Sequence, residues 1–227
     1  MENARWLIAF LGDSVTHGCF ETAPGGGATY DFEAVYHSRL RLMLSEKEPT
    51  RPVSVVNAGV NGDSAAGGLA RLDRDVLRFR PDLCVVNFGL NDVNGDYDRY
   101  VKSMDGIFSR LQAEGIPAVF LTCNMLNTYY NAAITAPRYY EYAHKTAEMQ
   151  LSGRLERYLD GAKEAAYRRG ARLCDCHEKW LAMYRAGLDT TVMLANGINH
   201  PVRELHGLFA GYLAKLLEGG LWTVRRP

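Results

Sequence analysis

The sequence predicts an α/β fold in three layers, with helices on both faces of a central, mainly five-stranded parallel sheet. Short apolar runs with strand character recur along the chain, at residues 5–11, 52–57, 82–88, 116–122 and 171–174. Most are continuous rather than alternating, which is typical of strands that are covered on both faces. Stretches of helical periodicity separate them, and this alternation implies right-handed crossovers between parallel strands.

Two of the helical stretches show a clear apolar stripe. In the first, four apolar side chains repeat at helical spacing, Leu69, Leu72, Val76 and Phe79. Arg71 and two further arginines fall on the outward side of that stretch, where we expect solvent. The second stretch closes the chain and carries Leu205, Leu208, Phe209, Tyr212, Leu213, Leu216 and Leu217. His206 lies within this pattern and is expected on the helix surface.

Length and composition predict one domain over residues 1–227, since no shift in composition marks a boundary. The 26 basic and 26 acidic residues balance, so we expect no nucleic-acid partner. The apolar run at residues 6–11 is too short for a signal peptide or a membrane span. Five cysteines, an odd number, fit reduced thiols. We therefore expect a cytoplasmic protein that does not associate with membranes.

Chemistry is expected in the loops that follow the strands. In open parallel sheets, ligands bind beyond the carboxyl ends of the strands, where the strand order reverses. The loops after the first three strands are small, polar and rich in glycine, at residues 12–18, 57–64 and 89–92. Acyl transfer needs a nucleophile with an adjacent base, together with donors for the oxyanion.

Ser14 is the candidate nucleophile, because it follows the first strand directly at the end of the triplet Gly12-Asp13-Ser14. A serine in this place can equally cap a helix. The same triplet recurs at Gly62-Asp63-Ser64, before the first striped helix, where capping by Asp63 or Ser64 is the expected role. The triplet alone is therefore a weak indication of catalysis.

Four segments in order resemble the motif blocks of the SGNH, or GDSL, hydrolase family along nearly the whole chain. They are the triplet at residues 12–14 and residues 57–62, 89–92 and 196–201. The resemblance implies a flavodoxin-like SGNH hydrolase fold and a serine esterase that uses no cofactor and no metal. It also implies an oxyanion hole built from the Ser14 amide, the Gly62 amide and the Asn91 side chain. Each such donor typically contributes about a hundredfold or more to turnover.

The histidine block departs from the family pattern. It reads Asn196-Gly197-Ile198-Asn199-His200, where the family carries an aspartate a few residues before the histidine. His200 is the expected base, although a histidine here could also cap the last helix. An amide can orient an imidazole but cannot neutralise its cation. Three interpretations stay open: a Ser-His dyad assisted by Asn196 or a backbone carbonyl, a carboxylate supplied by Asp189 through a longer loop, and weak or lost activity.

A tyrosine-rich segment at residues 124–144 follows the fourth strand, on the same rim of the sheet. Tyrosine rings suit stacking on sugars, and they suit a subunit interface in a homo-oligomer equally well. We assign substrate contacts to Asp13, Tyr129 and Tyr130. The glycines at 25–27 are expected in a flexible entrance loop.

The sequence thus predicts a carboxylic ester hydrolase that acts through an acyl-serine intermediate and removes acetyl or other short acyl groups from a carbohydrate or small-molecule ester. The missing aspartate motivates a rival, a weak or inactive family member that binds an acylated ligand. A third interpretation is a metal-dependent phosphoesterase built on Asp13, Asn91, Asp92 and Asp175. The spacing of Cys174, Cys176 and His177 favours buried thiols over a metal site.

Overall fold

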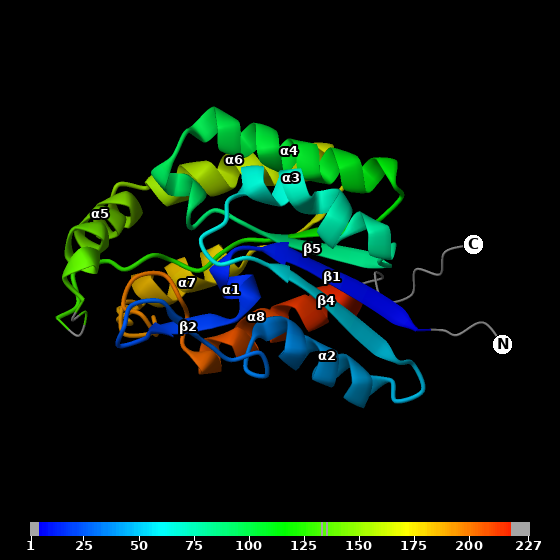
Figure 1. Ribbon diagram of the computed structural model, residues 1–227, viewed down its shortest axis with the longest axis horizontal. Helices are drawn as coiled ribbons and strands as arrows, with labels where there is room; N and C mark the ends of the chain where they lie inside the picture. The colour runs from blue at the N-terminus through cyan, green and yellow to red at the C-terminus, as the bar shows by residue number, and fades with distance from the viewer. Residues whose placement is uncertain (1–4, 133, 135, 219–227) are drawn as a thin grey trace.

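The computed structural model describes residues 5–132, 134 and 136–218. Within these residues a central sheet lies between two layers of helices (Figure 1). Its strands are β1 (Trp6–Gly12), β4 (Val53–Gly59), β5 (Leu83–Asn87), β6 (Ala118–Leu121) and β7 (Arg172–Cys174). Neighbouring strands pair in parallel in the order β4-β1-β5-β6-β7, which confirms the predicted three-layer fold.

Helices cover both faces of this sheet. In Figure 1, α3 (Ala65–Asp75), α4 (Tyr97–Ala113) and α6 (Arg154–Arg168) form the upper layer. The lower layer holds α2 (Tyr36–Lys47) and α8 (Arg203–Glu218), which contact each other. The remaining longer helices are α5 (Tyr140–Leu151) and α7 (Cys176–Arg185). None of the helices in the described ranges is both long and apolar enough to cross a membrane.

The central strands are apolar because both of their faces are buried. Every residue of β5 is buried, and Phe10 and Leu11 of β1 are wholly inaccessible to solvent. Burial of a Leu, Val or Phe side chain contributes about 1.5–3 kcal/mol. The edge strands β4 and β7 are less covered, and Leu173 of β7 is exposed. The core therefore holds β1 and β5 firmly, and their carboxyl ends can carry a precise site.

The strand order places a binding edge between β1 and β5. From β1 the chain crosses to β4 on one side and then returns to β5 on the other, so the connections diverge at this point. Ligand sites of open α/β sheets form where connections diverge in this way. Two short elements follow these strands, α1 (Ser14–His17) after β1 and the 3₁₀ turn η2 (Asp92–Asn94) after β5.

Residues 19–30 include the three glycines, 25–27, that were expected in a flexible entrance loop. They form an antiparallel hairpin of β2 (Cys19–Thr22) and β3 (Ala28–Tyr30) beside the carboxyl edge of the sheet (Figure 1). Gly26 and Gly27 form its turn with φ of +72° and +134°, a region that favours glycine. Strands of three and four residues are too short to show a period of two, so the sequence pattern does not reveal them.

The second Gly-Asp-Ser triplet caps a helix, as predicted. Ser64 is the N-cap of α3, and its Oγ accepts from the Gly67 amide at 3.4 Å.

The apolar stripe of residues 69–79 continues past α3 into the 3₁₀ turn η1 (Leu77–Phe79). This turn precedes β5, so it lies at the opposite edge of the sheet from the loops that follow the strands.

Candidate active site

The structure brings Ser14 and His200 together at the carboxyl edge of the sheet. Ser14 begins α1 directly after β1, and His200 lies in the loop before α8. The two residues are 186 positions apart in the chain, and Ser14 Oγ lies 2.9 Å from His200 Nε2. Both side chains are buried. This distance is within the range over which a general base takes a proton.

A backbone carbonyl holds the imidazole of His200 in place. Its Nδ1 lies 2.8 Å from the carbonyl oxygen of Phe20 in β2. Because a carbonyl only accepts, Nδ1 carries the proton and Nε2 of the neutral ring is left to accept from Ser14. Burial lowers the pKa of His200, while the Phe20 carbonyl and the charge of Glu21 act in the opposite direction. The imidazole is therefore neutral at pH 7, in the tautomer that a base needs.

Asn196 shapes the histidine loop and does not face Nδ1 of the ring. Its Oδ1 accepts from the amides of Ile198, Asn199 and His200 at 3.0, 2.9 and 3.0 Å. Its Nδ2 donates to Asn199 Oδ1 at 2.8 Å. The expectation that the Asn196 amide orients the imidazole directly is thus corrected: Asn196 positions the backbone of His200, and the Phe20 carbonyl orients the ring.

Asp189 lies away from the histidine. Its exposed carboxylate accepts from the Tyr129 hydroxyl at 2.7 Å and from the Thr191 amide at 3.0 Å. These bonds tie the carboxylate to its own loop and to the tyrosine-rich segment. The interpretation in which Asp189 completes a triad with His200 is therefore wrong.

The predicted oxyanion donors belong to loops that surround Ser14. Ser14 is the first residue of α1, so its amide has no acceptor within that helix. Gly62 lies in a turn in which the Asp63 amide donates to the Val60 carbonyl at 3.2 Å. Its φ of +77° is a conformation that favours glycine over residues with a side chain. Asn91 Nδ2 donates to the Asp63 carbonyl at 2.8 Å, which leaves its second N–H available to an oxyanion.

A small cavity of about 160 Å³ opens over the nucleophile, and we call it the catalytic cavity. Its lining includes Ser14, Asn61, Asn91 and His200, whereas the predicted donor Gly62 is not among the lining residues. This volume is below the roughly 300–1,000 Å³ of sites that enclose a drug-sized ligand, so the space suits a small group.

Two side chains hold the loop after β4 against the nucleophile loop. His17 Nδ1 accepts from the Asn61 amide at 3.1 Å. Arg71 donates to Asp63 Oδ2 at 2.7 Å and to the Gly12 carbonyl at 3.0 Å. Arg71 was expected in solvent, yet its side chain is only 11% exposed. It joins the end of β1 to the loop of the oxyanion donors, a role that helical periodicity does not reveal.

Asp13 lies beneath Ser14 and cannot touch a substrate, since its side chain is wholly buried. Its Oδ1 caps α1 by accepting from the Val15 amide at 3.0 Å, and its Oδ2 has no hydrogen-bond partner in the described part of the chain. Burial, with a smaller effect of the charges on Asp92 and Asp63, raises the pKa of Asp13 to about 7. The assignment of Asp13 to substrate contacts is therefore wrong.

An Asp13→Asn variant is expected to gain stability over the wild type as the pH rises from 5 to 8. The folded-state pKa of about 7 lies above the ordinary aspartate pKa of about 3.9, so the folded protein binds this proton more tightly. Between pH 5 and pH 7 its stability therefore falls by about 3 kcal/mol, at about 1.4 kcal/mol for each pH unit. The amide keeps the cap on the Val15 amide and does not ionise. Urea unfolding at both pH values measures the difference.

Asp98→Asn is the matched control for this experiment, because Asp98 is exposed. Its stability relative to the wild type is expected to be the same at pH 5 and pH 8. If Asp13→Asn behaves in the same way as this control, the carboxyl group beneath Ser14 does not ionise with the raised pKa described above.

Tyr139 and Tyr142 reach the catalytic cavity, and the two assigned tyrosines do not line it. Tyr129 is exposed, and its hydroxyl donates to the Asp189 loop. Tyr130 stacks on His144 with ring centroids 4.9 Å apart. The tyrosine-rich segment is thus in the predicted place, but the assignment of Tyr129 and Tyr130 to the substrate is corrected.

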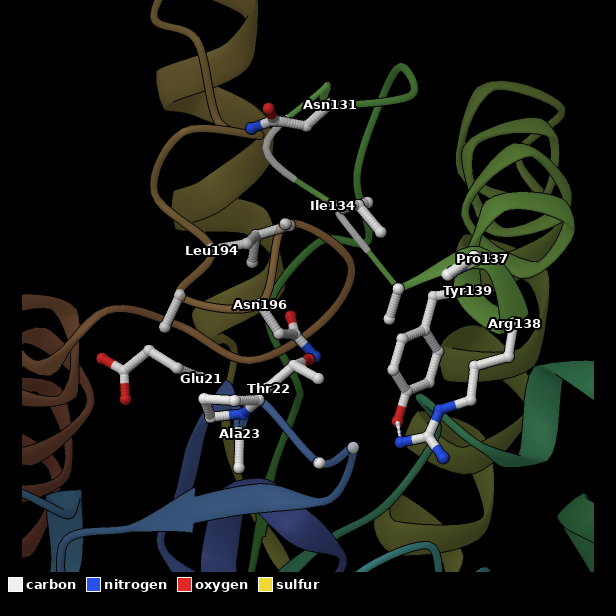
Figure 2. Close-up of a pocket in the computed structure, with 16 residues that line it drawn as sticks. Glu21, Thr22, Ala23, Asn131, Ile134, Pro137, Arg138, Tyr139, Leu194 and Asn196 are labelled. Carbon is white, nitrogen blue, oxygen red and sulfur yellow. Dashed lines mark hydrogen bonds between the residues drawn. The ribbon is translucent and has the colours of Figure 1, made fainter.

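A larger cavity adjoins the catalytic cavity, and we call it the side cavity (Figure 2). Its volume is about 710 Å³, within the range of small-molecule sites. The two cavities share Glu21, Thr22, Tyr139 and Asn196. The two cavities are therefore neighbours along these four residues.

The acids considered for a phosphoesterase serve separate structural bonds. Asp92 Oδ1 accepts from the Ala65 amide at 2.9 Å, and Asp175 pairs with Lys163 at 2.9 Å. No group of three or more His, Cys, Asp or Glu side chains within the described ranges is arranged to hold a metal ion. Cys174 and Cys176 are buried with their sulfurs 4.0 Å apart. The geometry therefore favours the serine and histidine pair as the reactive centre.

Comparison with protein families agrees with this geometry. Residues 10–208 match the GDSL-like Lipase/Acylhydrolase family. A segment of 92 residues is 30% identical to the acetylxylan esterase of Geobacillus stearothermophilus. That match covers 40% of this chain and 42% of the relative, so it spans less than half of the relative's length.

Solved structures share the fold over nearly the whole chain. The lipase/acylhydrolase from Enterococcus faecalis superposes with a TM-score of 0.69 at 19% identity, covering 94% of this chain and 96% of that one. A two-domain esterase active on acetylated mannans, co-crystallised with mannopentaose, has a TM-score of 0.67 at 18% identity. That match covers 98% of this chain and 51% of the other. The predicted fold and the family resemblance are confirmed.

Proposed function

The chain belongs to the GDSL-like lipase/acylhydrolase family, and on that premise we propose that it hydrolyses carboxylic esters through an acyl-Ser14 intermediate. The observation that carries the proposal is the 2.9 Å contact between Ser14 Oγ and Nε2 of an imidazole whose other nitrogen donates to a carbonyl. This arrangement supplies a nucleophile and a base in the correct tautomer.

In acylation, Ser14 Oγ attacks the ester carbonyl while His200 Nε2 takes the hydroxyl proton. The carbonyl oxygen becomes an oxyanion, which accepts from the amides of Ser14 and Gly62 and from the Asn91 side chain. Collapse of this intermediate breaks the bond to the leaving alkoxide, to which Nε2 returns the proton. The alcohol departs and the acyl group stays on Ser14.

Deacylation repeats these steps with water. His200 Nε2 takes a proton from a water molecule, whose oxygen attacks the acyl carbon, and the same donors hold the second oxyanion. Collapse then breaks the bond to Ser14 Oγ, which recovers the proton from the imidazolium. The products are the free acid and the regenerated serine.

The Phe20 carbonyl takes over part of the role of the absent aspartate. In a worked protease example, an Asp to Asn change in the triad costs about ten-thousandfold because the imidazole adopts the wrong tautomer. A carbonyl only accepts, so that loss does not arise here. The carboxylate of Glu21 also favours the imidazolium. A hydrogen bond with Arg203 lowers the pKa of Glu21 to about 2, so this carboxylate stays charged at working pH. Turnover is therefore proposed in preference to ligand binding alone.

For the substrate we propose an acetylated carbohydrate. The catalytic cavity has room for a short acyl group, and the side cavity has room for a larger alcohol portion. Tyr139 and Tyr142 offer flat apolar faces with polar tips, which suit a sugar ring. The names of the acetylxylan esterase and of the esterase active on acetylated mannans support the same substrate class.

Hydrolysis of nitrophenyl acetate, butyrate and octanoate, and of acetylated xylo- and manno-oligosaccharides, tests this proposal. We expect kcat/KM to fall by about tenfold or more from the acetyl to the octanoyl ester, because the catalytic cavity is small. Ser14→Ala is the control, and it is expected to abolish turnover of every ester. Tight binding of an acetylated sugar by the wild type without hydrolysis would contradict the proposal and favour the inactive rival.

A further inference from the structure

Arg138 brings a positive charge to the wall of the side cavity. It lies in the 3₁₀ turn η3 (Pro137–Tyr139), directly before Tyr139, which both cavities share. No carboxylate lies within 4 Å of its guanidinium in the described part of the chain, although most ion pairs elsewhere in that part involve an arginine. Its charge is thus available to a ligand in the cavity.

The guanidinium of the exposed Arg138 has two neighbours in the cavity wall. It lies over the Tyr139 ring at 4.7 Å from the centroid, and its Nη2 donates to the Tyr139 hydroxyl at 3.0 Å (Figure 2). It also lies against Gly26 of the hairpin turn, where a Cβ would collide with it. Contacts that limit the motion of a side chain reduce the entropy lost when a ligand binds.

The other charged side chain of the side cavity already belongs to an ion pair. Glu21 is paired with Arg203, and Thr29 donates to the same carboxylate. In Figure 2 the Glu21 carboxylate points away from the Arg138 side of the cavity. An anionic group near Arg138 therefore meets one uncompensated positive charge and little repulsion.

We infer that the side cavity binds the alcohol portion of the ester and that Arg138 selects alcohol portions that carry a carboxylate, as in an acetylated uronic acid. This inference rests on the proposed function and narrows its substrate class. A guanidinium matches the two oxygens of a carboxylate with parallel N–H groups. Arg138 is the single cation among the described lining residues, which suits a monoanion better than a phosphate dianion.

Two esters that differ only at C6 of the sugar test the inference. They are a monoacetylated methyl glucuronoside, with a carboxylate, and the matching methyl glucoside, with a hydroxymethyl group. We expect the wild type to have a kcat/KM about tenfold higher for the glucuronoside, since a charged hydrogen bond at a partly exposed site has an effect of that order. Raising the salt concentration is expected to reduce this preference, because exposed charges are screened.

Arg138→Gln is expected to lower the ratio of kcat/KM for the glucuronoside to that for the glucoside to about one. Arg138→Lys is expected to retain part of the wild-type ratio, because lysine keeps the positive charge without the paired N–H groups of the guanidinium. Arg78→Gln is the matched control. Arg78 is also exposed and lies over a neighbouring ring, Phe79, at 4.6 Å, but it belongs to η1 at the opposite edge of the sheet. This variant should keep the wild-type preference.

The outcomes separate this inference from the proposed function. Hydrolysis of nitrophenyl acetate with equal rates on the two sugar esters, unchanged in Arg138→Gln, would overturn the inference and leave the esterase proposal standing. Failure of the folded wild type to hydrolyse nitrophenyl acetate and both sugar esters would overturn the proposed function and this inference with it. A preference that Arg138→Gln removes and Arg78→Gln keeps supports the inference.

Discussion

A His200→Ala variant is expected to lose ester hydrolysis almost completely, with kcat/KM lower by about 10⁴-fold or more. Ser14 Oγ would lose the group that lies 2.9 Å away and takes its proton, and a neutral hydroxyl is a weak nucleophile. Steady-state hydrolysis of nitrophenyl acetate measures the loss. Added imidazole is expected to recover part of the activity by entering the vacated space.

The pH profile of the wild type gives an independent check on His200. Burial lowers the pKa of the imidazole, and the base must be neutral to act. The enzyme should therefore be fully active at pH 7 and lose activity only as the pH falls below the ordinary histidine range.

His144→Ala is the control for the His200→Ala variant, because this histidine is exposed and lies outside both cavities. If His200→Ala keeps activity within tenfold of this control, His200 is not the base.

An Asn91→Ala variant is expected to lose about 10²- to 10³-fold in kcat, with a much smaller change in KM. The amide donates to the Asp63 carbonyl at 2.8 Å and holds its second N–H ready for the oxyanion, which exists only in the transition state and the intermediates. Removal of a donor of this kind affects the chemical step more than substrate binding. Stopped-flow and steady-state kinetics with nitrophenyl acetate separate the two effects.

Two further variants show whether this loss is chemical or structural. Asn91→Asp keeps the shape but replaces a donor by an acceptor, and we expect it to be at least as impaired as Asn91→Ala. Asn94→Ala removes a neighbouring amide in η2 that donates to the Asn91 carbonyl at 3.2 Å and to the Tyr142 hydroxyl at 3.3 Å. It disturbs the same loop but keeps the Asn91 donor, so kcat should stay within about threefold of the wild type. Equal losses in Asn91→Ala and Asn94→Ala would indicate a damaged loop instead of a missing oxyanion donor.

The fold was predictable because the strands that build it are buried on both faces. Continuous apolar runs such as those of β1 and β5 leave little choice of architecture. Tertiary packing decided what the pattern did not show. His206 was expected on the helix surface, yet it is wholly buried, and its Nδ1 accepts from the Tyr36 amide at 3.1 Å. The helical period of α8 identifies its apolar face. It does not show that α2 also packs against His206 and buries this polar residue.

Ser14, Asn91 and His200 could be singled out because they lie in an ordered series of segments that resembles the motif blocks of the family. In the structure these segments follow β1, follow β5 and precede α8. The group that orients the imidazole could not be singled out in this way. A backbone carbonyl, here that of Phe20, has no side-chain signature, and it reaches Nδ1 only because β2 folds back beside the histidine loop. The burial of Asp13 was missed for a similar reason, since a polar residue after a strand can point outwards or beneath the site.

Phosphonylation of Ser14 tests the pairing of Ser14 with His200 most directly. The folded wild type would be treated with a fluorophosphonate, and its peptides analysed by mass spectrometry beside those of Ser14→Ala and His200→Ala. We expect one adduct on the peptide that contains Ser14, no adduct in Ser14→Ala, and a rate reduced by several orders of magnitude in His200→Ala. A folded wild type that stays unlabelled, or that carries the adduct on another serine such as Ser64, would contradict the esterase mechanism.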